Sequence, residues 1–387
     1  MTRHAYIGAD IFDGETLHTD KALLIEDDIV RAVCDPVDLP AGCAIATCDG
    51  GTLMPGFVDL QVNGGGGVMF NDETSPDGLK TIAEAHASTG TRALLPTLIT
   101  DTAERTRAAV DAVAQAIAAK VPGIVGIHLE GPHLSIARKG AHDPALIRPM
   151  EPADEAFLID AASRLPNVMV TVAPENVTPD QIGRLARAGV IVSLGHTDCS
   201  FDDAMAAFDA GAKCVTHLFN AMSQMGNREP GLVGAALQAR AVSAGLIADD
   251  IHVHAASMRA ALDAKRGPGE VFLVTDAMST VGSTITEFRL NGRRVLRHEG
   301  RLTLENGTLA GADLEMTRAL QVLVDGVGVP KAQALRMATG AAARCLRQAL
   351  GFGTLINAPV ANMIRLDDTL LISELGQTGA AHSAVTV

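Results

Sequence analysis

Four titratable residues stand where apolar runs of the chain stop. Glu130 closes GIVGIHLE, His196 closes VIVSLGH and His217 lies in KCVTHLF. Two imidazoles and one carboxylate are a common ligand set for a catalytic zinc-like ion, which keeps a further position open for water or substrate. The fourth residue, Asp276, follows EVFLVT and can take a proton from water and pass it to a leaving group. These residue types predict a metal-dependent hydrolase, with the first three as metal ligands and Asp276 as the acid–base.

A pair of carboxamides closes the stretch PGFVDLQVNG. Gln61 and Asn63 are two residues apart, so both side chains face one side of a strand. In many barrel hydrolases this position carries His-x-His, and the two imidazoles hold a metal. Carboxamides compete poorly with imidazole for a zinc-like ion. We therefore expect one metal rather than two, with Gln61 and Asn63 hydrogen-bonding near the water and the substrate.

These polar residues need a scaffold that brings strand ends together. Eight short apolar runs alternate with helical patterns, and the runs cover residues 56–62, 92–100, 123–131, 168–175, 190–198, 213–221, 243–250 and 270–278. Near-continuous apolar runs are typical of strands buried on both faces. The rhythm predicts an α/β fold, a (β/α)₈ TIM-like barrel, whose functional residues gather at the carboxyl ends of the strands. An open doubly wound sheet is the alternative, but no Gly-x-Gly-x-x-Gly motif follows the first run.

The two ends of the chain have a different pattern. Short alternating apolar stretches separated by turn residues fill the beginning, and the same style returns in GFGTLINAPVANMIRLDDTLLIS near the end. We predict three parts: residues 1–53 and 346–387 together form a small β-sandwich domain, and residues 54–345 form the barrel.

Composition limits the partners. The chain has 387 residues, of which 47% are hydrophobic, and a formal net charge of −14. The negative charge argues against nucleic acid or an anionic membrane as a partner. The six cysteines show no disulfide framework, and neither a signal peptide nor a membrane span is apparent. We expect a cytoplasmic protein.

The motifs also carry a family resemblance. In order, PGFVDLQVNG, HLEGPH, KGAH, SLGHTD, VTHLFNAM, REPG, VTDAM and GTLAG resemble the amidohydrolase superfamily and, within it, the N-acetylglucosamine-6-phosphate deacetylases. The resemblance extends over essentially the whole chain. It implies the metal and acid–base roles given above, and it implies one divalent ion per subunit, Zn²⁺ foremost and Fe²⁺, Co²⁺ or Mn²⁺ as alternatives.

The resemblance further implies residues that contact a small amino-sugar phosphate. His142 would hold the acetamide oxygen and assist catalysis, while Arg228 and His252 would bind the phosphate, one of them donated across a homodimer interface. Arg suits phosphate because its guanidinium bonds two oxygens at once. The remaining expected substrate contacts are Gln61, Asn63, Asn220, Ala221 and Leu309.

The implied activity is hydrolysis of N-acetylglucosamine 6-phosphate to glucosamine 6-phosphate and acetate. Three alternatives stay open at this stage: the galacto-configured substrate, another mononuclear amidohydrolase, and a barrel that binds sugar phosphates without catalysis. A two-metal cyclic-amide hydrolase or deaminase is disfavoured, because the fourth run, VMVTVAPE, lacks the bridging Lys common in that class.

Overall fold

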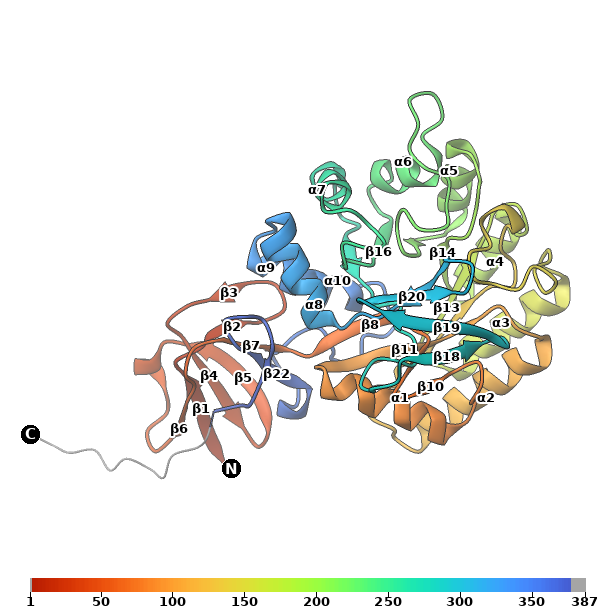
Figure 1. The fold of residues 1–387 in the computed structure, drawn as a ribbon. Helices are drawn as coiled ribbons and strands as arrows, with labels where there is room; N and C mark the ends of the chain where they lie inside the picture. Colours follow the sequence, from red (N-terminus) through yellow and green to blue (C-terminus); the bar gives the residue numbers. More distant parts are fainter. Residues whose placement is uncertain (1, 377–387) are drawn as a thin grey trace, which may run out of the picture.

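A parallel β-barrel forms the centre of the molecule in a computed structural model that describes residues 2–376 (Figure 1). Its strands are β8 (Phe57–Val62), β11 (Thr91–Ile99), β12 (Ile127–Glu130), β13 (Val168–Val172), β14 (Ile191–Leu194), β15 (Cys214–Val215), β16 (Ser243–Leu246) and β17 (Val271–Leu273), hydrogen-bonded in that order. Each coincides with one of the eight apolar runs, although β11 begins one residue before its run, so the predicted strands and their order are confirmed.

The barrel closes between its first and last strands. The Asp276 N–H donates to the Gln61 carbonyl at 3.0 Å, and Val62 forms a parallel bridge with Ala277. All six residues of β8 are buried, as are those of β12 to β15, because side chains fill the inside and helices cover the outside. This closure places the end of β8 directly beside Asp276.

Helices cover the outside of the barrel. The first seven are α1 (Pro76–Ser88), α2 (Ala103–Ala118), α3 (Pro152–Arg164), α4 (Pro179–Arg187), α5 (Phe201–Ala210), α6 (Gly231–Gln238) and α7 (Ala255–Ala264). The cap of α2 is Thr102, which accepts a hydrogen bond from the Arg105 N–H, rather than Asp101, one residue earlier, whose spacing to Glu104 suggests a capping box. Three shorter helices follow the last barrel strand: α8 (Met316–Gln321), α9 (Lys331–Met337) and α10 (Gly340–Ala343).

The two ends of the chain share one sheet. Its order is β23-β22-β7-β2-β3, and its strands are β2 (Asp10–Phe12), β3 (Leu17–His18), β7 (Thr52–Pro55), β22 (Met363–Leu366) and β23 (Ile372–Ser373). A second sheet holds β1 (Arg3–Ile7), β4 (Ala22–Glu26), β5 (Ile29–Cys34) and β6 (Ala44–Thr47). A terminal β domain is therefore confirmed. The predicted boundaries stay predictions, and the last part of the C-terminal segment, 377–387, lies outside the described residues.

An antiparallel sheet is inserted between β17 and α8 and was not part of the sequence prediction. It contains β18 (Glu287–Leu290), β19 (Arg293–His298), β20 (Arg301–Leu304) and β21 (Leu309–Ala312). Its buried leucines and Val295 cluster with Ile99, the last residue of β11, and with Met278, which follows β17. The insertion (cyan in Figure 1) therefore packs onto the carboxyl-terminal side of the barrel. A short hairpin with two residues in each strand, β9 (Gly64–Gly65) and β10 (Val68–Met69), lies on the same side, directly after β8.

No helix within residues 2–376 combines the length and the apolar character that crossing a membrane requires.

Candidate metal and catalytic site

A cavity of about 400 Å³ opens among the loops that follow the barrel strands. Most of the predicted functional residues line it: Asn63, Glu130, His142, His196, His217, Asn220, Ala221, His252, Asp276 and Leu309. The inserted sheet supplies Leu290, Thr308 and Gly311 in addition to Leu309. Gln61 and Arg228 are the predicted site residues that do not line it. A cavity of this size suits a small polar molecule held by a few convergent polar groups.

Three donor atoms in this cavity form a tight triangle. Glu130 Oε1 lies 3.3 Å from His196 Nε2 and 3.1 Å from His217 Nε2, and the two imidazole nitrogens are 3.1 Å apart. Donors at about 2.0–2.2 Å from a tetrahedral zinc-like ion lie roughly 3.4 Å from one another. All three side chains are buried. The triangle therefore fits a single divalent cation in both chemistry and spacing.

The charge on Glu130 also suits a ligand. Burial alone would raise its pKa, but the hydrogen bonds and positive charge of His196 and His217 hold the pKa of this carboxyl well below its usual range. Backbone contacts orient His196 in turn: its Nδ1 lies 2.9 Å from the Arg138 carbonyl, and its own carbonyl accepts from the Ser135 N–H. Partners of this kind fix the orientation of metal-binding imidazoles.

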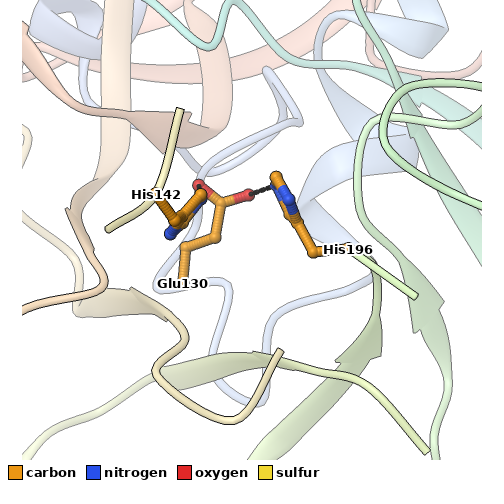
Figure 2. A group of neighbouring side chains, drawn as sticks. All are labelled: Glu130, His142 and His196. Carbon is orange, nitrogen blue, oxygen red and sulfur yellow. Dashed lines mark ion pairs between the residues drawn. The ribbon is translucent and has the colours of Figure 1, made fainter. Parts of the chain in front are cut away.

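His142 is a looser neighbour of the triangle. Figure 2 shows His142 and His196 on opposite sides of the Glu130 carboxylate, with His142 Nε2 at 3.8 Å from Glu130 Oε2. One possible ligand atom each of Glu130, His142 and His196 also lies within 4.8 Å of the other two, so these three residues are an alternative ligand set. We prefer His217 as the third ligand, because its nitrogen is 3.1 Å from both partners. His142 is then a group beside the metal.

The protonation of His142 follows from its surroundings. Burial, reinforced by the nearby His196, lowers the pKa of His142 to about 3, so the ring is neutral at pH 7. The Thr100 N–H points at His142 Nδ1 from 3.3 Å, and the Thr100 hydroxyl lies 2.8 Å from the same atom. We assign Nδ1 as the acceptor, which leaves the ring proton on Nε2. His142 can then donate a hydrogen bond from Nε2.

Asp276 is held by the two carboxamides of β8. Its Oδ1 accepts hydrogen bonds from Gln61 Nε2 at 3.1 Å and from Asn63 Nδ2 at 2.7 Å. Burial raises the pKa of Asp276 to about 6, with the Glu130 charge adding to the rise and His217 and Asn63 opposing it. A pKa near neutrality is what a group needs to accept and return a proton at physiological pH.

A polar pair marks another part of the cavity. His252 lines it, and its Nδ1 lies 2.6 Å from Asp249 Oδ2. Asp249 Oδ1 also accepts from the backbone N–H groups of Ile251 and His252, at 2.8 and 2.7 Å. Asn220 and Ala221 line the cavity as predicted. Arg228, by contrast, is exposed on the loop between Ser223 and α6 and faces none of this cavity.

Two supporting residues escaped the sequence prediction. Thr100 is the polar residue that ends the second apolar run, and this position at a strand end could have identified it as a site residue. Asp249 stands three residues before His252 in DDIH, a spacing typical of local side-chain contacts. Two other histidines lie elsewhere: His128 contacts the Leu60 carbonyl and the Thr171 hydroxyl, and His254 caps α7.

Comparisons with known proteins show similarity over most of the chain. The model of the amidohydrolase family matches residues 52–355. The N-acetylgalactosamine-6-phosphate deacetylase of Shewanella sp. (strain ANA-3) is 43% identical over 82% of this chain and 80% of its own. The N-acetylglucosamine-6-phosphate deacetylase of Haemophilus influenzae is 34% identical over 93% of this chain and 94% of its own. The crystal structure of N-acetylglucosamine-6-phosphate deacetylase from Pasteurella multocida superposes with a TM-score of 0.90 at 33% identity, over 96% of this chain and 97% of the other.

Proposed function

The chain belongs to the amidohydrolase family, and we propose that it hydrolyses N-acetylglucosamine 6-phosphate to glucosamine 6-phosphate and acetate. The enzyme class is a hydrolase acting on an amide C–N bond. One observation carries the proposal: a three-donor triangle spaced for one cation and the Asp276 carboxylate share a single cavity of about 400 Å³.

The cofactor we propose is one divalent ion per subunit, Zn²⁺ foremost, held by Glu130, His196 and His217. When bound, such an ion supplies Lewis acidity, which polarises the acetyl carbonyl and makes a neighbouring water more acidic. Gln61 and Asn63 occupy the strand end where other barrel hydrolases carry His-x-His, and both spend their amide N–H groups on carboxylates. Because carboxamides compete poorly with imidazole for such an ion, we propose no second equally tight metal site at this strand end.

The protein's own groups move the proton. Asp276 Oδ1 is occupied by the two carboxamides, so Oδ2 is the atom that takes the proton of the attacking water. As the water oxygen bonds to the acetyl carbon, His142 donates from Nε2 to the acetyl oxygen, where negative charge develops. Asp276 then gives its proton to the sugar nitrogen, the C–N bond breaks, and the amine and acetate leave.

The phosphate is proposed to lie against His252, Asn220 and the backbone of Ala221. Binding energy from this group, remote from the amide, orients the acetyl group for attack. Arg228 is exposed and outside the cavity of its own subunit. We therefore propose a homodimer in which Arg228 reaches the phosphate of the neighbouring subunit.

Mixed dimers test the donation directly. Asp276→Asn and Arg228→Ala are each expected to be nearly inactive alone. In a mixed dimer, the subunit that keeps Asp276 receives an intact Arg228 from its neighbour, so mixing and re-assembly should restore activity. A mixture that stays as inactive as its parts, although mixed dimers are shown to form, contradicts donation across the interface.

The substrate assignment is tested by comparing kcat/KM for three sugars. We expect N-acetylglucosamine 6-phosphate to exceed unphosphorylated N-acetylglucosamine by orders of magnitude, with about one metal per chain. The galacto-configured phosphate is the second candidate, because the Shewanella relative, at 43% identity, bears that name. A higher kcat/KM for it would reassign the substrate, and a protein without metal or turnover on any of them would favour a non-catalytic binding barrel.

A cytoplasmic location is part of the proposal. All six cysteines are free thiols and four of them are buried, as is usual in a reducing compartment.

A further inference from the structure

The amide NH₂ groups of Gln61 and Asn63 meet two carboxylates, although Asn63 also lines the cavity. Gln61 Nε2 donates to Glu130 Oε1 and to Asp276 Oδ1, both at 3.1 Å, which uses both of its amide hydrogens. Asn63 Nδ2 adds a shorter bond to the same Asp276 oxygen, at 2.7 Å. Both amide side chains are buried, at 2% and 0% exposure. Each carboxylate oxygen can only accept, so the contacts fix which end of each amide faces it.

The electrostatics of the site explain why donors are needed there. Glu130 and Asp276 are both buried acids, at 3% and 9% exposure, that follow different barrel strands, and their like charges oppose each other. In sites with His-x-His at this strand end, a cation would separate such acids. Here the NH₂ group of Gln61 bridges them with a hydrogen bond to each. A neutral donor thus occupies the position between the two charges.

The backbone holds these donors in place before any ligand binds. Asp276 N–H donates to the Gln61 carbonyl at 3.0 Å, and Asn63 N–H donates to the Ala277 carbonyl at 2.8 Å. The end of β8 and the segment of Asp276 are therefore joined on both sides of the carboxylate. A 1 Å displacement of a reacting group can lower a rate by about 10²-fold, so rigid support matters here.

We propose that Gln61 and Asn63 form a carboxamide clamp, defined as these two residues, which acts through Asp276 as a positioning device rather than on the substrate. The clamp fixes Asp276 Oδ1 and leaves Oδ2 as the atom that exchanges the proton. Gln61 lies outside the cavity lining; Asn63 lines the cavity, but its NH₂ group is bonded to Asp276 Oδ1. The inference rests on the proposed function, since it assigns a task to the acid–base of that reaction.

A double-mutant cycle tests whether Asn63 acts through Asp276. Asn63→Ala is expected to lower kcat by about 10²-fold, with KM changed less than about threefold and about one metal per chain retained. In the Asp276→Asn background the same change should alter the residual kcat less than about threefold, because the group it positions no longer takes the proton. Losses that multiply in the double variant overturn the proposal.

Two further variants separate donation from packing. Asn63→Leu keeps an approximate shape and removes the donor, so it should be about as slow as Asn63→Ala; near-normal turnover contradicts the clamp. Asn71 is a matched control: it is equally buried and bonds the Ile99 backbone and Asp101, away from Asp276. Any loss from Asn71→Ala should multiply with that of Asp276→Asn.

A crystal structure gives a readout independent of turnover. In the metal-loaded double variant Gln61→Ala with Asn63→Ala, the Asp276 carboxylate should rotate away from its wild-type orientation. An unchanged carboxylate overturns the clamp. If the wild-type protein deacetylates none of the sugar phosphates, the proposed function fails, and the clamp is then judged by this structural comparison alone.

Discussion

Replacing Asp249 by Asn should weaken recognition of the phosphate while leaving the metal site intact. Asp249 Oδ2 accepts from His252 Nδ1 at 2.6 Å, and Oδ1 accepts two backbone N–H groups. Asparagine can keep the two backbone bonds through its carbonyl oxygen. Its NH₂ group then opposes the ring N–H of His252, so the ring must change tautomer or turn. The loop is preserved and the His252 contact is lost.

The size of the effect follows from the bond that disappears. Burial alone would raise the pKa of Asp249, but the His252 hydrogen bond and charge, with two backbone N–H groups, lower it, so the carboxylate is ionised at neutral pH. A hydrogen bond to a charged group contributes about 1.5–3 kcal/mol. If that energy is used to bind the phosphate, kcat/KM for N-acetylglucosamine 6-phosphate should fall about 10- to 150-fold.

The unphosphorylated sugar is the internal control for this prediction. The kcat/KM of the variant for this sugar should change less than about threefold. The preference for the phosphorylated substrate should therefore decrease by about the same factor as kcat/KM for N-acetylglucosamine 6-phosphate. Asp250→Asn is the matched control, because Asp250 is exposed and its side chain accepts from the Ala255 N–H rather than contacting His252. Equal losses on both sugars, or no loss on either, would refute the assignment of His252 and Asp249 to phosphate recognition.

Three other changes give independent checks. Asp276→Asn should retain metal and substrate binding but lower kcat at least about 10²-fold, since general acid–base catalysis contributes about that much. Calorimetry measures the binding and a turnover assay measures kcat; a near-normal kcat contradicts the role. Glu130→Gln, or dialysis of the wild type against a chelator, should lower metal content and activity together, and added Zn²⁺ should restore only the dialysed wild type; full activity at zero metal contradicts the metal site. Burial lowers the pKa of His86 to about 4. Near pH 5 the unfolded chain therefore binds a proton at this residue that the folded chain does not, and the free energy of unfolding falls as the pH drops below about 6.5. Urea unfolding should show that His86→Gln removes about 2 kcal/mol of the loss between pH 7 and pH 5; an unchanged loss argues against burial of a neutral ring.

The barrel was predictable because its signals are local. Each buried strand leaves an apolar run, and helices such as α4 carry a cap at Thr178 and a breaker at Gly189. The inserted sheet β18–β21 was missed because its strands are exposed in alternation and rich in Arg, a pattern that also fits a solvated loop. One face of this sheet becomes buried when it packs against Met278 and Ile99, which are distant in the sequence.

The site was predictable in its membership and less so in its contacts. Strand-end position brought Glu130, His196, His217 and Asp276 together before any geometry was known. The partners of Gln61 depend on the register across the barrel closure, where Val62 meets Ala277, and no sequence spacing encodes this register. The exposed position of Arg228 depends on a loop conformation that is equally invisible in the sequence.

The backbone at the site shows how these side chains leave the strands. His196, His217 and Asp276 have φ values of 48°, 29° and 52°, in a region that non-glycine residues rarely adopt. Each stands two or three residues beyond the last residue of its strand; these last residues are Leu194, Val215 and Leu273. Such a conformation costs of order 1–3 kcal/mol and persists only where neighbours impose it. The pleat would otherwise continue and alternate side chains between barrel interior and helices.

The neighbours that impose this conformation at Asp276 are the same ones that hold its carboxylate. The Asp276 N–H is bonded to the Gln61 carbonyl, and its own carbonyl accepts from the Ala312 N–H of the inserted sheet at 2.9 Å. The turned backbone and the clamped side chain therefore share one support, which comes from β8 on one side and from β21 on the other. It follows that the inserted sheet holds the backbone of the acid–base as well as forming a wall of the cavity. A change in β21 that shifts the Ala312 N–H should lower kcat even though Ala312 itself does not line the cavity.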